Sequence, residues 1–326
     1  MKKSLLALAV AAALPAFAQA QTNIVLNGSI DAAMEYTDPD VAGQDSDIRM
    51  RQGVWSGSRL AVVGTEELGG GLKGIFNIEH RLSPDDGTVT SGATFWAGQA
   101  WVGLQGGFGA VRLGRQYTPI FRAIAPGDMT GYSWLNNGVG LAGTQIRFNN
   151  DLSYQSPSLG GFTIHAAYAP GEQPGDDKLG DTIGISGVGA FGPVNFGLGY
   201  HGIDGGNTGA DIDEMAVSLG TKFGAFGIGL AAATSDIDAP GSDKRKGYYV
   251  SLSAGLGAGT VYLTLKQEDN YDYVNDLDNT GIGLTYSHGL SKRTFVYVAA
   301  GYNKVDQLGG GETKPKSIAL GMRHFF

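Results

Sequence analysis

The sequence is dominated by a two-residue alternation of apolar and polar side chains, which its last ten residues show clearly. Counting back in twos from Phe326 gives a mostly apolar set, whereas the other phase, which includes Arg323, is mostly small or charged. Because successive side chains of a β-strand point to opposite faces, residues 315–326 are predicted to form a strand with one apolar face. The apolar phase consists of Ile318, Leu320, Met322, His324 and Phe326.

The N-terminus has the form of a secretory signal peptide. A basic start is followed by an apolar run to Ala18, and Ala18-Gln19-Ala20 supplies a small-x-small cleavage site. Cleavage after Ala20 would remove residues 1–20 and leave residues 21–326. No other apolar stretch approaches the roughly 18 residues that a spanning helix needs. An exported chain with this alternation is predicted to close a sheet with its apolar face toward lipid and its polar face toward water.

The composition narrows the possible functions. The chain has no cysteine, which excludes a disulfide framework, a thiolate metal site and a cysteine nucleophile. Its net charge of -8 argues against a nucleic-acid partner. We expect no cofactor and no resident metal. A surface calcium ion between acidic loops remains an alternative, although Ser287 stands where a calcium loop beginning at Asp276 requires glutamate.

Sixteen segments have strand-like alternation, and an even number is typical of single-chain outer-membrane barrels. Short glycine-containing connections such as 68–71 alternate with long polar ones such as 37–49. The predicted fold is all-β: a 16-stranded antiparallel transmembrane β-barrel with short periplasmic turns and long extracellular loops. The predicted strands are 23–36, 50–66, 71–84, 94–106, 109–117, 146–157, 161–171, 181–191, 193–203, 212–224, 225–236, 245–257, 259–269, 279–289, 292–304 and 315–326.

The connection after Tyr117 is unusually long, because the strand pattern does not resume until about Ile146. A stretch of this length without strand pattern in a compact fold is usually functional. We predict that residues 118–145, the third long loop, fold inward and narrow the lumen. A floppy external loop is the alternative.

Several motifs follow one another in a fixed order along the chain. The set ends with a C-terminal phenylalanine and resembles the general porins of Gram-negative outer membranes, most closely the beta-proteobacterial branch. The resemblance implies a homotrimeric, water-filled channel for passive diffusion of ions and small hydrophilic solutes. It also implies that the barrel-assembly machinery recognises the C-terminal strand through Phe326, His324, Met322 and Leu320. The motifs are Ser58–Leu72, Val102–Gly109, Leu113–Gln116, Leu152–Pro157, Lys292–Thr294 and Gly321–Phe326.

The resemblance further implies a ladder of wall arginines that faces acidic groups on the third loop. Arg59 and Arg147 match two wall arginines, and Asp128 matches an acidic loop position. The chain departs from the family pattern at Gly98, where a wall arginine is common, and at Tyr132, where a second acid is common.

Two more cations are candidates for the constriction. Glu79 and Arg81 share a strand face with Asn77 and match lumen-facing positions, so Arg81 is a candidate replacement for the missing wall arginine. Arg122 either lines the constriction or anchors the loop. Because a narrow channel focuses the field of fixed charges, these arginines predict a mild anion preference, which the acidic outer loops oppose.

Three other classes of function compete with a general diffusion channel. A solute-specific channel would carry an aromatic slide, for which Phe121, Tyr132 and Trp134 on the long loop are the only candidates. An enzyme is not expected, and no catalytic residues are assigned, because the chain lacks a nucleophile elbow and paired-histidine zinc spacing. An adhesive or structural barrel would conduct no ions.

Overall fold

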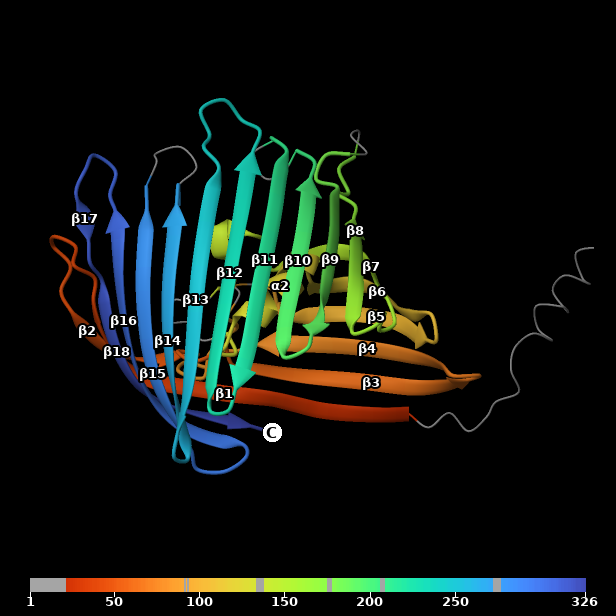
Figure 1. Cartoon of the computed structure of the whole chain (residues 1–326), viewed down its shortest axis with the longest axis horizontal. Helices are drawn as coiled ribbons and strands as arrows, with labels where there is room; N and C mark the ends of the chain where they lie inside the picture. The colour runs from red at the N-terminus through yellow and green to blue at the C-terminus, as the bar shows by residue number, and fades with distance from the viewer. Residues whose placement is uncertain are drawn as a thin grey trace, which may run out of the picture.

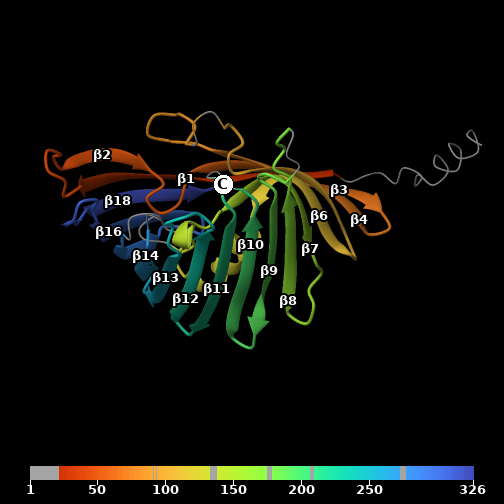
Figure 2. The same ribbon diagram turned by 90° about the horizontal axis from the view of Figure 1, so that it is seen from above.

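The chain forms one closed antiparallel sheet (Figures 1 and 2). The computed structural model describes residues 22–90, 92, 94–132, 138–174, 178–205, 209–271 and 277–326. The predicted signal peptide lies outside these residues. Strand β1 (Thr22–Asp38) pairs on one side with β18 (Lys316–Phe325) and on the other with β2 (Asp47–Gln52) and β3 (Arg59–Gly69), which closes the barrel.

The barrel wall has sixteen strands, as predicted. Strands β2 and β3 are two halves of one wall strand, since both pair with β1, and β17 (Glu312–Thr313) only extends the β16 edge within a loop. The other strands are β4 (Leu72–Arg81), β5 (Gln99–Gly106), β6 (Gly109–Tyr117), β7 (Arg147–Gln155), β8 (Phe162–Ala169), β9 (Thr182–Phe191), β10 (Val194–Ile203), β11 (Ile212–Phe223), β12 (Phe226–Ile237), β13 (Arg245–Leu256), β14 (Gly259–Asp269), β15 (Asn279–Gly289) and β16 (Thr294–Asp306).

The two ends of the barrel differ. From β8 to β18 the long connections lie at the top of Figure 1 and the short turns at the bottom. The turns between β9 and β10 and between β11 and β12 contain only two residues each. None of the helices in the described part of the chain is long and apolar enough to cross a bilayer.

The alternation has the predicted phase. On β18, Leu320 and Met322 are 67% and 54% exposed on the outer face, whereas Arg323 is 9% exposed on the inner face. Phe326 completes the barrel seam, because its N–H and C=O exchange hydrogen bonds with the backbone of Gly28 at 3.2 Å. A side chain at Gly28 would collide with the Phe326 ring, so glycine permits this seal.

The prediction of one continuous strand over 50–66 is wrong. Residues 53–58 leave the ladder between β2 and β3 and fold inward, with Gly53 at φ +66°. The buried carboxylate of Asp31 holds this bulge by accepting from the Ser56 N–H at 3.0 Å, and the Ser58 hydroxyl accepts from the Asp31 N–H at 2.9 Å. The apolar pair Val54-Trp55 suits a strand locally, and the bulge depends on a contact with a distant residue.

The third long loop folds inward, as predicted. We call residues 118–146 loop L3, and within it 133–137 lie outside the described residues. Helix α2 (Pro119–Ile124) contacts β9, β10 and β11, and the 3₁₀ turns η1 (Ala125–Gly127) and η2 (Leu141–Gly143) contact β12 and β13. Figures 1 and 2 show α2 inside the ring of strands.

Candidate functional site

Loop L3 lies close against the inner wall because the wall offers glycines there. A Cβ at Gly197, Gly220 or Gly229 would lie 1.8–2.2 Å from a backbone oxygen of L3. The loop therefore rests directly on the strand backbones. The apolar side of L3 packs at the same place, with Ile120 and Leu141 almost fully buried against small wall residues.

Both roots of L3 are fixed by one buried side-chain pair. The Ile120 N–H donates to His201 Nε2 at 3.0 Å, and His201 Nδ1 lies 3.0 Å from Glu214. The Gln145 N–H donates to both oxygens of Glu214 at 3.1 and 3.2 Å. Since Nε2 accepts a bond, the proton is assigned to Nδ1, which donates to the carboxylate. His201 and Glu214 thus connect the beginning of L3 with its end.

Polar side chains of the wall also bind the backbone of L3 further along the loop. The Ser251 hydroxyl accepts from the Met129 N–H at 2.9 Å and donates to the Gly127 carbonyl at 2.8 Å. Glu268 accepts from the Ala142 N–H at 3.1 Å. The wall from β9 to β14 therefore carries the loop, which leaves the open lumen on the side of β1, β3 and β4.

Arg59 and Arg81 lie side by side on the opposite wall, as paired residues of β3 and β4. Arg59 is paired with Ser29 of the inner face of β1, and Arg81 is paired with Arg59, so both side chains are on the lumenal face. Arg81 forms an ion pair with Glu79 at 2.6 Å. A Cβ at Gly98 would lie 2.2 Å from the Glu79 carboxylate, so Glu79 fills the space into which a residue-98 side chain would extend.

Arg147 joins this group through Tyr117, the last residue of β6. The Tyr117 hydroxyl accepts from Arg81 at 2.7 Å and from Arg147 at 3.1 Å. The Arg147 guanidinium also lies 4.6 Å from the centre of the Tyr117 ring. A hydroxyl has two acceptor lone pairs, so one tyrosine can hold both cations.

Asp128 has most of its hydrogen-bonding capacity taken up within L3. Its Oδ1 accepts from the N–H and hydroxyl of Thr130 at 2.7 and 2.6 Å, and its Oδ2 accepts from the Tyr132 N–H at 2.9 Å. The Tyr249 hydroxyl donates to it at 3.3 Å. Within the described residues Asp128 forms no ion pair with an arginine. Its carboxylate can therefore act on the wall arginines only through long-range electrostatic attraction.

Tyr132, at the loop position where the family commonly has a second acid, contributes to an aromatic stack. Its ring lies 5.0 Å from Phe121, which in turn stacks on Tyr117 at 4.1 Å with planes 11° apart. The stack connects L3 with the arginine-bearing wall. Trp134, the third aromatic residue considered for a slide, lies outside the described residues.

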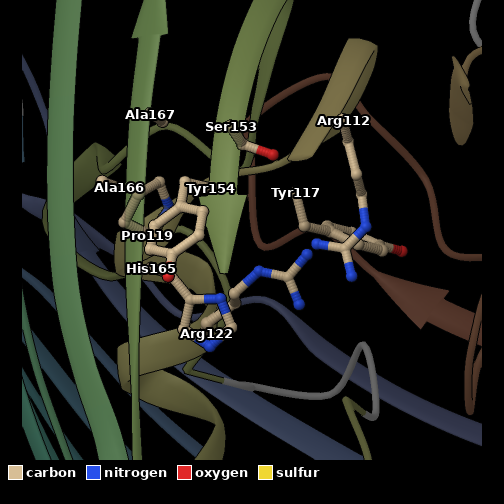
Figure 3. A pocket seen from close by; sticks show the side chains of 9 residues that line it. All are labelled: Arg112, Tyr117, Pro119, Arg122, Ser153, Tyr154, His165, Ala166 and Ala167. Carbon is tan, nitrogen blue, oxygen red and sulfur yellow. The ribbon is translucent and has the colours of Figure 1, made fainter. Parts of the chain in front are cut away.

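Arg122 lies against β6 to β8, between the loop and the wall. Figure 3 shows the guanidinium groups of Arg122 and Arg112 pointing toward each other beside Tyr117 and His165, around a space of about 10 Å³ that suits one water molecule. Burial lowers the pKa of Arg122, and the fields of Tyr132 and Asp151 oppose that shift. Of the two roles considered for Arg122, this position favours anchoring the loop.

Neither the strand pattern nor the family resemblance assigned a role at the site to Arg112, Arg323, Tyr117, His201 or Glu214. Arg323 was placed on the polar phase of the last strand, which is a signal for a lumenal cation. Arg112 has the same signal, because its neighbour Leu113 is 56% exposed on the outer face. Nothing local distinguishes the other three, whose roles depend on contacts across the barrel. No group of three or more His, Asp or Glu side chains among the described residues is placed to hold a metal ion.

Comparison with known proteins identifies the family. A family model described as Gram-negative porin matches residues 7–308. The chain is 37% identical over 317 residues to outer membrane porin protein 32 of Delftia acidovorans, covering 91% of this chain and 88% of the relative. Its fold matches a solved anion-selective porin from Comamonas acidovorans with a TM-score of 0.80 and 29% identity, over 94% of this chain and 100% of that one. A Vibrio cholerae outer membrane protein solved in a trimer form shares the fold, with a TM-score of 0.69, 16% identity and coverage of 94% and 99%. The chain therefore belongs to the Gram-negative porin family, and it is a channel protein of the outer membrane.

Proposed function

We propose that this porin passes ions and small hydrophilic solutes by passive diffusion through a lumen narrowed by L3, with a mild preference for anions. The observation that supports the preference is the excess of unpaired positive charge on the open wall. Among the described residues Arg59, Arg112, Arg147 and Arg323 have no carboxylate within ion-pair distance. Arginine stays charged at any relevant pH, and a narrow low-dielectric channel focuses its field.

In this proposal Arg59, Arg81 and Arg147 form the basic wall of the constriction. Asp128 and Glu79 supply the acidic side, with Tyr132 and Arg122 shaping the loop. Glu79 neutralises much of the Arg81 charge at 2.6 Å, so Arg59 and Arg147 carry the net field. Solutes bind weakly at such a site, since conduction requires that they also leave.

Reversal potentials in planar bilayers test the preference. Under a KCl gradient the parent channel should show a reversal potential with the sign expected for anion selectivity. The double variant Arg59→Gln, Arg147→Gln should move it toward cation selectivity without closing the channel. A parent channel that is cation-selective, or a double variant with an unchanged potential, would contradict the proposed role of these arginines.

A solute-specific channel is the second candidate, and the stack of Tyr117, Phe121 and Tyr132 favours it. Liposome swelling with neutral sugars and charged solutes separates the two. Permeation rates that fall smoothly with solute size indicate a general channel. One solute that permeates much faster than others of its size indicates a specific channel. Catalysis is not part of the proposal.

We further propose a homotrimer that is exported with cleavage after Ala20. The proposal for the trimer is supported by family membership and by the trimeric relative with the same fold. Light scattering of the detergent-solubilised protein tests the trimer, and the N-terminal sequence of the mature chain tests the cleavage.

The C-terminal strand is proposed to be the signal for the barrel-assembly machinery. Phe326, His324, Met322 and Leu320 share the outer phase, and Leu320 and Met322 are exposed there. Deletion of Phe326 should lower the amount of folded protein in the outer membrane, compared with a Leu308→Ala variant in an exposed loop.

A further inference from the structure

A second cavity lies between L3 and the short-turn end of the barrel. It has a volume of about 300 Å³. Residues of β14, β15, β16 and β18 near their short turns line one side, and Met129–Gly131 of L3 line the other. A cavity of this size is at the lower end of the range for small-molecule sites. None of the residues assigned to the constriction above lines it.

Aromatic rings in fixed positions form part of this cavity. The Trp55 ring lies edge to face with Tyr262, with centroids 5.3 Å apart and planes at 87°. It also meets Tyr297 at 5.6 Å, and the Tyr297 hydroxyl donates to the buried Asp31 at 2.6 Å. Since Trp55 is only 7% exposed, its ring is held in place before any solute arrives.

Arg323 supplies a positive charge on the same lining. Its guanidinium lies 4.1 Å from the centre of the Phe325 ring, and its buried Nε has no hydrogen-bond partner. No carboxylate among the described residues lies within ion-pair distance of it. The paired residue Asp31 already accepts bonds from Tyr297 and Ser56. The cavity therefore combines aromatic rings with an unpaired guanidinium.

We propose that this cavity is a transient binding subsite for aromatic carboxylates. The carboxylate pairs with the guanidinium of Arg323, whose planar fork suits two parallel hydrogen bonds. The flat ring of the solute packs against Trp55 and Tyr262, where edge-to-face contact is favourable. The inference rests on the proposed function, because a solute reaches the cavity only through an open lumen.

Current noise from the full mature protein in a planar bilayer tests the subsite. Benzoate, acetate and benzyl alcohol are added in turn to the short-turn side in KCl, and residence times are taken from the noise spectra. Benzoate should reside about tenfold longer than acetate, since the contact between aromatic rings slows dissociation by up to about tenfold. Benzyl alcohol, which carries the ring without the charge, should give no excess noise.

Two variants and one control locate the effect. Trp55→Leu and Arg323→Gln should each reduce the residence of benzoate to that of acetate. Trp101→Leu, which removes another tryptophan of the inner face outside this cavity, should leave the residence of benzoate as in the parent. If Arg323→Gln does not fold, Tyr262→Leu replaces it, with the same expectation.

The outcomes separate the subsite from the channel function. A protein that conducts no ions would overturn the proposed function. A conducting parent in which benzoate and acetate have equal residence times would overturn the subsite alone. Benzoate residence that persists in both Trp55→Leu and Arg323→Gln, or that is lost in Trp101→Leu, would also overturn it.

Discussion

The replacement of His201 by alanine should release both roots of L3. In the parent, His201 accepts from the Ile120 N–H and donates to Glu214, and Glu214 holds the Gln145 N–H. His201 and Glu214 are 0% and 2% exposed, so water does not replace these bonds in the closed loop. His201→Ala leaves one buried N–H without an acceptor and one buried carboxylate without its imidazole donor.

The size of the effect follows from these two losses. A buried donor left without a partner costs about 1–3 kcal/mol, and a hydrogen bond to a charged group contributes about 1.5–3 kcal/mol. Water entering the void offsets part of the cost, so the free energy of loop opening should fall by about 2–5 kcal/mol. Each 1.4 kcal/mol is a factor of ten, which gives roughly thirtyfold to several-thousandfold more opening.

Amide hydrogen exchange of the detergent-solubilised protein measures this opening. The amides of Ile120 and Gln145 should exchange faster in His201→Ala by the factor above, and the channel current should flicker. Glu214→Gln should show a smaller effect, because its amide oxygen still accepts from one partner. His288→Ala is the matched control, because this histidine is on β15 in the same outward phase as the exposed Ile282 and Leu284. Exchange at Ile120 and Gln145 within about threefold of the parent would refute the reasoning.

Three further predictions concern the wall. Gly220→Val should prevent L3 from seating, since its Cβ would lie 1.8 Å from the Pro126 oxygen, and single-channel conductance should rise; Gly187→Val, with nothing within 4 Å, is the control. Arg81→Ala removes the partner of Glu79 and should shift the reversal potential toward cations, whereas an unchanged potential would contradict its lumenal role. Tyr297→Phe removes the bond to Asp31 and should cost about 1.5–3 kcal/mol of stability, seen as a lower temperature of heat denaturation on gels; Tyr36→Phe on the outer face should change it little.

Much of the fold was predictable because alternation is a local property. The strand predicted over 279–289 has the same bounds as β15, and the inner phase of the last strand correctly contains Arg323. The bulge at residues 53–58 was not predictable, since it depends on Asp31, more than twenty residues away in the sequence. Alternation predicts which way a side chain points, but not where a strand leaves the sheet to meet a distant partner.

The site was predictable to the same extent. The lumenal positions of Arg59 and Arg81 follow from strand phase, and the opposed pair on β3 and β4 agrees with it. The bridging role of Tyr117 did not follow, because its hydroxyl meets arginines that lie 36 and 30 residues away in the sequence. The close seating of L3 did not follow either, because a glycine in a strand leaves space without showing what fills it. At Gly197, Gly220 and Gly229 that space is occupied by the backbone of L3.

The proposed anion preference of an acidic chain follows from where the charges lie. Asp204, Asp211, Asp236 and Asp238 lie in or beside the long loops, where ions screen a charge over about 8–10 Å. The unpaired arginines lie inside the barrel, where low-dielectric walls concentrate their field. Under the proposed function a passing ion should therefore respond mainly to Arg59 and Arg147, and a net charge of -8 does not predict cation selectivity. Raising the salt concentration should weaken the influence of the outer acids more than that of the arginines, so the proposed anion preference should persist at high salt.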